Sequence, residues 1–597
     1  MVQFLTVKFP YLQYFHAHLG YRMYLLLVVS IAVGVMDGLG LAMFLPLLEL
    51  LTDQNDIAST EKMGNLAFIL NSLNYLGLKL TLNVVLVTMF IFFTCKGLAM
   101  YFQQYLTASY QQFFIRNIRV ENIDALAAYS YYAFVKEDVG LIQNTLSGEV
   151  QRVMSGFQKY TAILKLFILV LTYASLAFLA NPEFAVLVLI GGWVSNFIFS
   201  YLYKKTKSLS SELVKSNHGF QGLLIQEVAF FKYLKSTASI EKYALKLKER
   251  VYEIEKAMRT IGILDGIMRG LREPLMIGIV VLVIIIQVNY LGGSLSTIIL
   301  SLLFFYRCLT SVMTLQSNYN QFLSVSGSLE NMTVFINKLK KHQEVFGKTP
   351  FQGLDKALKL NKVSFMYDEG IDILKDIDLI INKNETIAFV GESGSGKTTL
   401  MNILIGLLKP TTGMFFLDET DSLQIDITTY QKRIGYITQD PVIFDDTIYN
   451  NVSFWAEKTP ENRLRFEEAL KKASILDFML AQPKREDTRL GNNGINLSGG
   501  QKQRISIARE LYKEVEFLFM DEATSALDSA TEKEIQTNID TLKGNYTILI
   551  IAHRLSTIKN ADRVVVLNKG RIERIGSYKQ LVKESKAFQR MIALQEV

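Results

Sequence analysis

Cysteine is almost absent from this chain, whose 597 residues include two. Cys95 and Cys308 both fall within apolar runs, so the sequence implies no disulfide framework and suits a reduced or membrane-buried setting. Charged residues are also sparse, at 20%, while half of the residues are hydrophobic, which is a high share for a soluble protein. The apolar residues concentrate in the first 320 positions, and the remainder resembles an ordinary soluble α/β domain in composition. The length predicts several domains.

An N-terminal secretory signal is not expected either. Polar and charged residues interrupt any apolar core before the first long run: Lys8, Pro10, His16, His18 and Arg22. We expect instead an amphipathic segment on the membrane surface, with an apolar side made by Phe4, Leu5, Phe9, Leu12 and Phe15. Low-complexity tracts and internal repeats are not evident.

Six apolar runs are long enough to cross a bilayer as helices, which takes about 20 residues. We expect spans near residues 23–50, 82–107, 160–180, 183–203, 262–290 and 294–318. Long, helix-like connections at 108–159 and 204–261 alternate with very short ones, and the connection at 51–81 has room for a short surface helix. Basic residues gather in 204–261, which favours the cytosol for the long connections and the N-terminus. Six such runs in the core of one soluble protein would be improbable.

A glycine-rich stretch, GESGSGKTT, fits the pattern G-x-x-x-x-G-K-[ST] between a strand-like run, ETIAFV, and a helix-like run, LMNILIGLL. Its glycines let the backbone bend so that N–H groups face phosphate oxygens. Lys397 would add positive charge near the β- and γ-phosphates of ATP, and the Thr398 hydroxyl would ligate Mg²⁺. The predicted ATP-binding residues of this loop are Gly391, Glu392, Ser393, Gly394, Ser395, Gly396, Lys397, Thr398 and Thr399.

Two carboxylates end a second strand-like run, FLFMDE at 517–522. Asp521 is placed to hold Mg²⁺, directly or through water, and Glu522 to orient or deprotonate the attacking water. Such a pair can also be the solvated end of a strand. The phosphate loop upstream favours the catalytic interpretation.

The stretch LSGGQKQR at 497–504 resembles the signature sequence of ABC transporter ATPases, and residues 355–597 resemble that family in the order of their motifs. The resemblance implies that Tyr367 stacks on adenine. It also implies that Gln439 senses Mg²⁺ and the membrane domain, and that His553 contacts the γ-phosphate.

Two short stretches complete the comparison of motifs. The stretch SALD at 525–528 resembles the D-loop of the same family. The stretch RLGNNG at 489–494 departs from exporter-type relatives, because it lacks their acidic residue before the signature.

The signature predicts a dimer. Ser498 and the N–H groups of Gly499 and Gly500 precede a helix and would form an anion site at its N-terminus. In the family this site, to which we add Gln501, binds the γ-phosphate of ATP held by the opposite subunit. One ATPase domain with intact motifs therefore implies a homodimer with ATP sandwiched between two copies.

Six spans followed by one such domain resemble an exporter-type ABC half-transporter. The expected fold is an all-α six-helix transmembrane domain at 1–340 and an α/β P-loop ATPase domain at 341–597. The expected location is the cell membrane of a bacterium, with the ATPase domain in the cytoplasm. Coupling helices are expected near 134–150 and 217–227. No nucleic-acid partner is expected.

Cations inside the predicted spans bear on the charge of the transported substrate. At 1.5 Å of rise per residue, Lys96, Lys165 and Arg307 fall near one level in the cytosolic half of the membrane, with Arg269 and Arg272 closer to the cytosol. Two interpretations remain open. These cations line a cavity that binds an anion, or they are structural, with Glu273 neutralising an arginine and the lysines reaching the headgroups. Asp37 is expected to lie too far away to pair with them.

An anionic amphiphile would fit such a cavity, with membrane lipids around its chains. The membrane half also resembles, more loosely, bacterial flippases of lipid-linked oligosaccharides, in GLGLAMFLPLLELL of the first span and YRCLTSV of the sixth. Flipping of such a lipid is the leading prediction. An exporter of drugs, peptides or lipid A-type lipids is the alternative, and an ATP-gated channel or regulator is an alternative of another class.

Overall fold

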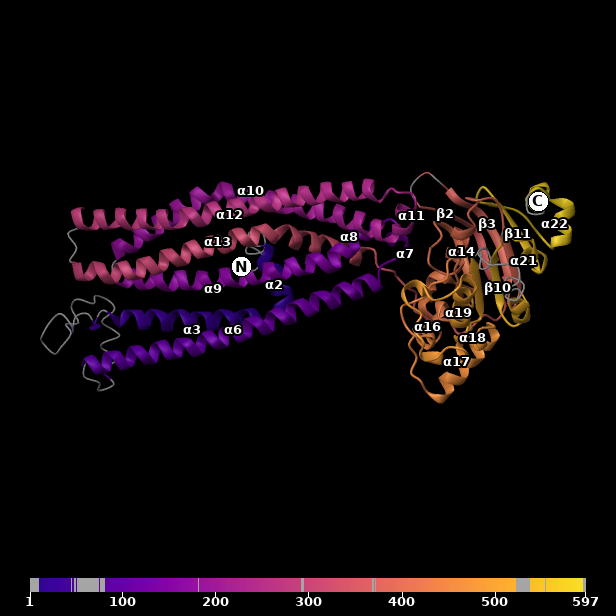
Figure 1. The fold of residues 1–597 in the computed structure, drawn as a ribbon, viewed down its shortest axis with the longest axis horizontal. Helices are drawn as coiled ribbons and strands as arrows, with labels where there is room; N and C mark the ends of the chain where they lie inside the picture. The colour runs from indigo at the N-terminus through magenta and orange to yellow at the C-terminus, as the bar shows by residue number, and fades with distance from the viewer. Residues whose placement is uncertain are drawn as a thin grey trace. The chain divides into compact units, whose positions relative to one another are not determined.

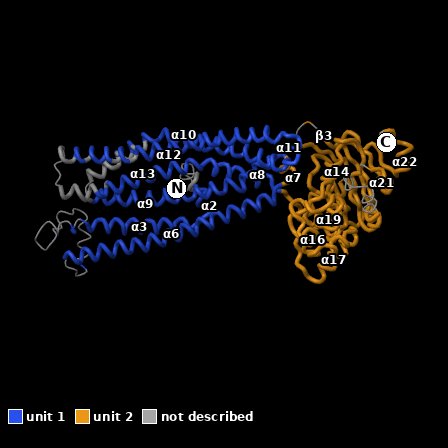
Figure 2. Tube along the Cα trace, in the orientation of Figure 1, with its two compact units in different colours: residues 1–129, 136–343 blue, residues 130–135, 344–597 orange. Residues whose placement is uncertain are grey.

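The computed structural model describes residues 10–44, 46–47, 50, 75, 81–180, 182–290, 295–367, 370, 372–521, 537–552 and 554–593. The chain forms two compact units (Figure 2). The helical unit comprises Met1–Tyr129 and Lys136–Gln343, and the sheet unit comprises Ser130–Val135 and Glu344–Val597. A short segment inside the first expected domain therefore belongs to the second unit.

Long helices build the helical unit (Figure 1). They are α2 (Pro10–Leu19), α3 (Arg22–Ala42), α6 (Leu82–Ala127), α9 (Val150–Ala180), α10 (Pro182–Ala229), α12 (Ile240–Tyr290) and α13 (Leu295–Lys341). Shorter segments are α8 (Val139–Asn144), a π-helical turn (Thr145–Glu149) and α11 (Phe231–Ser236). Every expected span lies largely on a helix, but α6, α10, α12 and α13 extend well beyond their spans. The long connections are thus mainly continuations of the spanning helices.

Three of these helical stretches are long and apolar enough to cross a membrane within the described part of the chain: Arg22–Ala42, Leu82–Ala127 and Val139–Leu179. In the apolar window of α6, 6% of the residues are buried, so this helix presents an apolar surface to its surroundings. The spans expected on α10, α12 and α13 include side chains outside the description and stay predictions. The surface helix expected at 51–81 lies almost entirely outside the described residues.

Apolar side chains hold the helices together in two main clusters. One joins α3, α9 and α13 through Leu41, Tyr173 and Phe304. The other anchors α2, whose Phe15 is fully buried and stacks on Tyr160 with ring centroids 4.5 Å apart. Phe15 therefore packs inside the helical unit, whereas Phe4, Leu5, Phe9 and the Leu12 side chain lie outside the described residues, so a membrane-surface segment stays a prediction.

Helix α12 is the longest, with 51 residues, and it contains Pro274 in its interior. Proline cannot donate the hydrogen bond to the carbonyl four residues earlier, which here belongs to Gly270. Gly262, Gly266 and Gly270 precede it at intervals of four, and a Cβ added at any of them would meet no atom within 4 Å. Along this stretch α12 therefore has one side without side chains, and it lacks the backbone hydrogen bond that residue 274 would donate to Gly270.

The sheet unit contains a six-stranded sheet in the order β12-β11-β4-β10-β9-β8. Its strands are β4 (Thr386–Val390), β8 (Ile434–Ile437), β9 (Phe517–Asp521), β10 (Thr547–Ile551), β11 (Arg563–Asn568) and β12 (Arg571–Gly576). All neighbours are parallel except β11 and β12. β4 and β10 are buried along their whole length, which explains their continuous apolar sequences.

A four-stranded antiparallel sheet, in the order β3-β2-β5-β6, packs beside it. Its strands are β2 (Ala357–Met366), β3 (Asp372–Asn382), β5 (Thr412–Leu417) and β6 (Thr420–Asp421), and β1 (Thr349–Pro350) pairs with β7 (Ile425–Asp426). The helices are α7 (Tyr131–Phe134), α14 (Lys397–Leu404), α15 (Ile427–Gln431), α16 (Ile448–Ser453), α17 (Pro460–Lys472), α18 (Leu476–Leu480), α19 (Gly499–Tyr512), α21 (Leu555–Lys559), α22 (Tyr578–Glu584) and α23 (Lys586–Ala593).

Candidate nucleotide site

The predicted ATP-binding motifs meet at one edge of the six-stranded sheet. Four parallel neighbours, β4, β10, β9 and β8, end there, and their pairing aligns Phe389 with Ile551 and Ile551 with Asp521. Ligands of such sheets bind outside the carboxyl ends of the strands. The glycine-rich loop follows β4, Asp521 ends β9, and Gln439 lies just after β8. The fold thus brings together motifs that lie up to 130 residues apart in the chain.

Glycines are required at two positions of the loop. Gly391 has φ +155°, and a Cβ there would lie 2.2 Å from the Leu567 carbonyl oxygen. Gly396 has φ +100° and precedes the first residue of α14, where a Cβ would lie 2.8 Å from Leu374 Cδ2. The loop therefore bends tightly against β3 and β11 and leads directly into the N-terminus of a helix, the place where a phosphate binds best.

Two buried polar side chains of this loop fit a phosphate ligand. Lys397 is 7% exposed, and its ammonium donates hydrogen bonds to the carbonyls of Gly391 (2.8 Å) and Glu392 (3.1 Å). Ser395 is 4% exposed, and its hydroxyl has no hydrogen-bond partner among the described atoms. An unsatisfied buried hydroxyl is costly in a folded protein, so a phosphate oxygen would complete the site.

Asp521 ends β9, and Tyr436 of the neighbouring strand lies beside it. Burial, together with the charge of Asp521, raises the pKa of Tyr436 to about 12, so this hydroxyl stays protonated. Gln439 is exposed after β8, and Thr398 is exposed in the first turn of α14. These positions suit the predicted Mg²⁺ ligands Thr398, Gln439 and Asp521. Glu522 and His553, together with the stretch 525–528, lie outside the described residues, so their catalytic roles stay predictions.

The signature forms the expected helix start. Ser498 caps α19: its hydroxyl accepts from the Gln501 N–H (3.3 Å), and the Gln501 side chain accepts from the Ser498 N–H (2.9 Å). This reciprocal capping fixes the entry of the chain into the helix. Ser498 and Gly499 are exposed, and the serine hydroxyl can still donate its hydrogen to an anion.

Tyr367 follows the last residue of β2 and lies among aromatic rings. Phe365 contacts it edge to face, with centroids 4.9 Å apart, and Tyr132 of α7 lies parallel to it at 6.3 Å. The parallel tyrosine comes from a segment that the sequence placed between two membrane spans. It is therefore a neighbour of the site that motif reasoning missed.

Arg509 is a second residue that the motifs missed. It is 5% exposed within α19 and donates to the Asn451 carbonyl (2.6 Å), the Val442 carbonyl (2.8 Å) and the Asn451 side-chain oxygen (3.1 Å). It thereby ties the segment after Gln439 to the signature helix. The available signal was a charged residue among apolar neighbours in ISIARELY.

The expectation that Asp37 lies far from the membrane cations is wrong. Asp37 is 5% exposed and forms an ion pair with Lys96, and it also accepts a hydrogen bond from the Tyr173 hydroxyl. Asp37 and Lys96 lie about equally far along the chain from the connection between their two antiparallel spans, so they share a depth. Lys96 therefore has a carboxylate partner in the helical unit, which favours a structural role for it.

The other predicted cavity cations differ in their surroundings. Arg269 pairs with Asp265 on the same helix at 2.8 Å, and the side chain of Arg272 lies outside the description. Lys165 is half-buried on α9, and Arg307 is exposed on α13. Within the described residues, no carboxylate forms an ion pair with Lys165 or Arg307. Glu273 does not neutralise Arg307 there.

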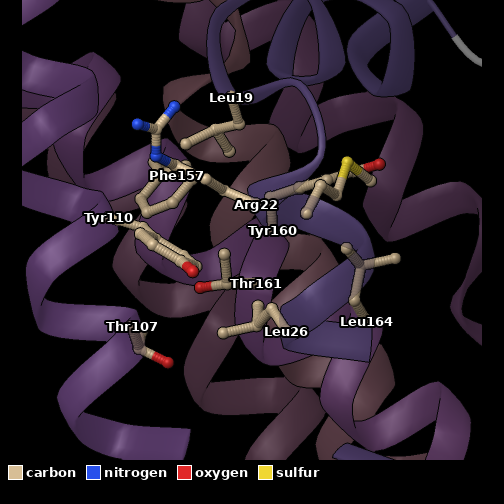
Figure 3. A pocket seen from close by; sticks show the side chains of 10 residues that line it. Leu19, Arg22, Leu26, Thr107, Tyr110, Phe157, Tyr160, Thr161 and Leu164 are labelled. Atoms are coloured by element: carbon tan, nitrogen blue, oxygen red, sulfur yellow. The ribbon is translucent and has the colours of Figure 1, made fainter. Parts of the chain in front are cut away.

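A small cavity lies where α3 begins, against α6 and α9 (Figure 3). Arg22, Tyr110 and Thr161 line it together with apolar side chains, and the Arg22 guanidinium lies 3.9 Å from the centroid of the Phe113 ring. At about 10 Å³ it holds no more than one water molecule. It is not a substrate site for a lipid.

The coupling helices expected near 134–150 and 217–227 stay predictions. The part that joins the sheet unit is Ser130–Val135, which overlaps the start of 134–150 only. In the second connection, α10 runs through 217–227 without a break, and the chain turns at Ala229 and Phe230 before α11. Val228, Phe230, Phe231 and Tyr233 at this turn are all exposed. Exposed apolar clusters of this kind are typical of contact surfaces.

Comparisons with known proteins decide the family. The family model described as "ABC transporter" matches residues 374–525. The heterocyst differentiation ATP-binding protein HepA of Nostoc is 31% identical over 468 residues, which are 78% of this chain and 76% of that protein. The chain belongs to the ABC transporter family. The ATP-dependent lipid A-core flippase of Hahella chejuensis is 29% identical over 514 residues, covering 84% and 86% of the two proteins.

A solved structure shares the fold of this transporter. It is a bacterial Atm1-family ABC exporter with ATP bound, with a TM-score of 0.77, 21% identity and coverage of 97% of this chain and 99% of the other. The predicted fold class and the predicted half-transporter architecture are confirmed. The transporter binds ATP and couples its hydrolysis to export across a membrane.

Proposed function

We propose that this transporter is a homodimer in the bacterial cell membrane that flips a phosphorylated glycolipid. ATP binds the loop at 391–399 of one copy and the signature helix of the other. Mg²⁺, held by Thr398, Gln439 and Asp521, would neutralise charge on the phosphates. Glu522 would activate the attacking water, and His553 would contact the γ-phosphate.

Arg307 carries the proposal for the charge of the cargo. It lies exposed on α13 and has no carboxylate partner among the described residues. A cation inside a membrane-spanning stretch costs free energy unless it meets an anion or a water-filled cavity. A phosphate of the cargo would supply that anion. Lys165 is a weaker second candidate, because a lysine can extend its ammonium to the headgroups.

Two lipid classes share this chemistry. Lipid-linked oligosaccharides carry a pyrophosphate between sugar and lipid, and lipid A-type lipids carry phosphates on an acylated sugar. The loose likeness of the first and sixth spans supports the former. The latter is supported by the Hahella chejuensis relative, whose name is lipid A-core flippase. We rank both above drugs and peptides, which need no anion site.

A flipping assay in proteoliposomes tests the proposal. The full chain is offered a pyrophosphate-linked glycolipid, a lipid A-type lipid or a neutral glycolipid, with and without ATP. We expect ATP-dependent movement of at least one phosphorylated lipid and none in the Glu522→Gln variant, whose hydrolysis should fall by about 10²-fold or more. Arg307→Ala should abolish stimulation of the ATPase by that lipid, whereas Arg307→Lys should retain part of it.

The outcomes separate the alternatives. Equal or exclusive movement of the neutral lipid would refute the phosphate site. Movement of ions through the wild type and the Glu522→Gln variant alike would favour the ATP-gated channel instead.

A further inference from the structure

Tyr132, from the first long connection of the helical unit, contacts Tyr367, the residue predicted to stack on adenine. Tyr132 donates a hydrogen bond from its hydroxyl to the Tyr367 carbonyl at 2.6 Å. The two rings are parallel, with an interplanar angle of 0° and centroids 6.3 Å apart. Both stand at 89° to the buried ring of Phe365. The three rings form one packed cluster.

The segment that carries Tyr132 is fixed within the sheet unit by its neighbours. Ser130 caps α7 by accepting from the Ala133 N–H at 3.4 Å. The Tyr131 backbone N–H donates to Glu344 at 3.4 Å, and the Tyr131 ring packs against the apolar core of this unit. Ser130 thus caps α7, Tyr131 anchors it to the core of the sheet unit, and Tyr132 contacts Tyr367. Tyr132 is held in place rather than resting on the surface by chance.

We propose that Tyr132 is a positioning residue for adenine binding: its hydroxyl and ring hold Tyr367 in the orientation that stacks on the base. This inference rests on the proposed role of Tyr367 as the adenine-stacking aromatic.

The physical reason is preorganisation. Tyr367 lies at the end of a strand, where the chain turns, and a ring that is free to rotate there loses conformational entropy when the base binds. Tyr367 is already held by the hydrogen bond that its carbonyl accepts from Tyr132 and by two aromatic neighbours. Its ring therefore has less conformational entropy to lose and binds the base more tightly.

Linkage makes the effect reciprocal. If α7 improves the binding of adenine, bound adenine stabilises the docking of α7 by the same factor. Residues 128–138 connect α6 with α8, so an occupied base site would hold the connection between two spanning helices. A phosphate bound at Lys397 and Ser395 is not expected to do so, because Tyr132 contacts Tyr367 and Phe365.

The test compares ligands with and without a base on the purified full-length transporter. Dissociation constants are measured for ATP and for inorganic tripolyphosphate, by displacement of trinitrophenyl-ATP, in Tyr132→Phe, Tyr132→Ala, Tyr367→Ala and the double alanine variant. Phe134→Ala is the matched control, because Phe134 is an exposed aromatic residue of the same short helix.

We expect Tyr132→Ala to weaken ATP binding by about two- to tenfold, the range of an aromatic pair, and to leave tripolyphosphate binding unchanged. Tyr132→Phe keeps the ring and should lose less. The double variant should bind ATP no more weakly than Tyr367→Ala, and Phe134→Ala should match the wild type.

Contrary outcomes are distinct. Weaker ATP binding in Tyr367→Ala with wild-type binding in both Tyr132 variants would overturn the role of Tyr132 and leave that of Tyr367. No change in Tyr367→Ala would overturn both. Equal weakening of ATP and tripolyphosphate, or equal effects of Tyr132→Ala and Phe134→Ala, would reduce Tyr132 to general support of the fold.

Discussion

Single side chains show how charge is handled in the helical unit. The sequence identified Lys96 and Arg307 as unusual cations within apolar runs, and the structure shows that their surroundings differ. Lys96 meets Asp37, which a second partner, Tyr173, also holds. Arg307 is exposed without an acidic partner among the described residues. Substrate chemistry is therefore better sought at Arg307 than at Lys96.

Asp37→Asn should destabilise the transporter. Removing one partner of a buried ion pair costs about 3–5 kcal/mol, and we expect the lower end because the Lys96 side chain keeps 23% of its exposure. Thermal unfolding in detergent measures the loss. The double variant Asp37→Asn, Lys96→Met should regain most of it, since no unpaired charge remains. If Asp37→Asn unfolds like the wild type while transport is lost, the pair serves the cargo and not the fold.

Arg509→Met should weaken the sheet unit by about 2–3 kcal/mol, because three acceptors lose a charged donor and two of them are backbone carbonyls. In Arg509→Lys a single ammonium replaces the planar guanidinium, so its free energy of unfolding should lie between those of Arg509→Met and the wild type. Urea unfolding monitored by tryptophan fluorescence measures this, because Trp455 lies in the same region. Unchanged unfolding in Arg509→Met would show that other contacts suffice.

Helices and strands differed in how far their sequences predicted them. The stretches ETIAFV and FLFMDE predicted β4 and β9, because buried parallel strands are apolar on both faces. The apolar runs also located long helices, three of which are long and apolar enough to span a membrane within the described residues. The helix-like character expected of 108–159 and 204–261 agrees with the structure, where most of both connections lies on helices and Phe114, Ile115 and Ile118 form a buried apolar stripe of α6. The end of α6 at Ala127 was not predicted, because its packing partners are distant in the sequence. Tyr132 was beyond reach, since no local pattern links residue 132 with residue 367.

The turn between β4 and α14 allows a matched comparison. Gly396→Ala would place a Cβ 2.8 Å from Leu374 Cδ2 at φ +100°, whereas Gly394→Ala, at φ +79°, would meet no atom within 4 Å. Both variants bear backbone strain of roughly 1 kcal/mol, but only the first adds a clash. Trinitrophenyl-ATP binding should therefore be lost in Gly396→Ala and weakened about fivefold in Gly394→Ala. Equal losses would contradict this account of the loop.

At the scale of the whole molecule, we expect two copies to share each ATP site. Lys397→Ala removes the cation of the phosphate loop, and Ser498→Arg blocks the signature helix. Either homodimer should be inactive. Co-expressed with different tags and purified as the mixed dimer, the two variants should recover about half of the wild-type ATPase rate, because one of two composite sites is intact. A mixed dimer as inactive as its parents would argue against shared sites.

The interrupted ladder of α12 has a mechanical consequence. A helix of 51 residues extends for about 77 Å and is stiff where every carbonyl has its partner. Near Gly270 and Pro274 one bond of the ladder is missing, and the glycines remove the side chains that would resist bending. Elastic deformation of this helix should therefore concentrate at one point. A push on its cytosolic end would change the angle between two rigid segments rather than shift the whole rod along its axis.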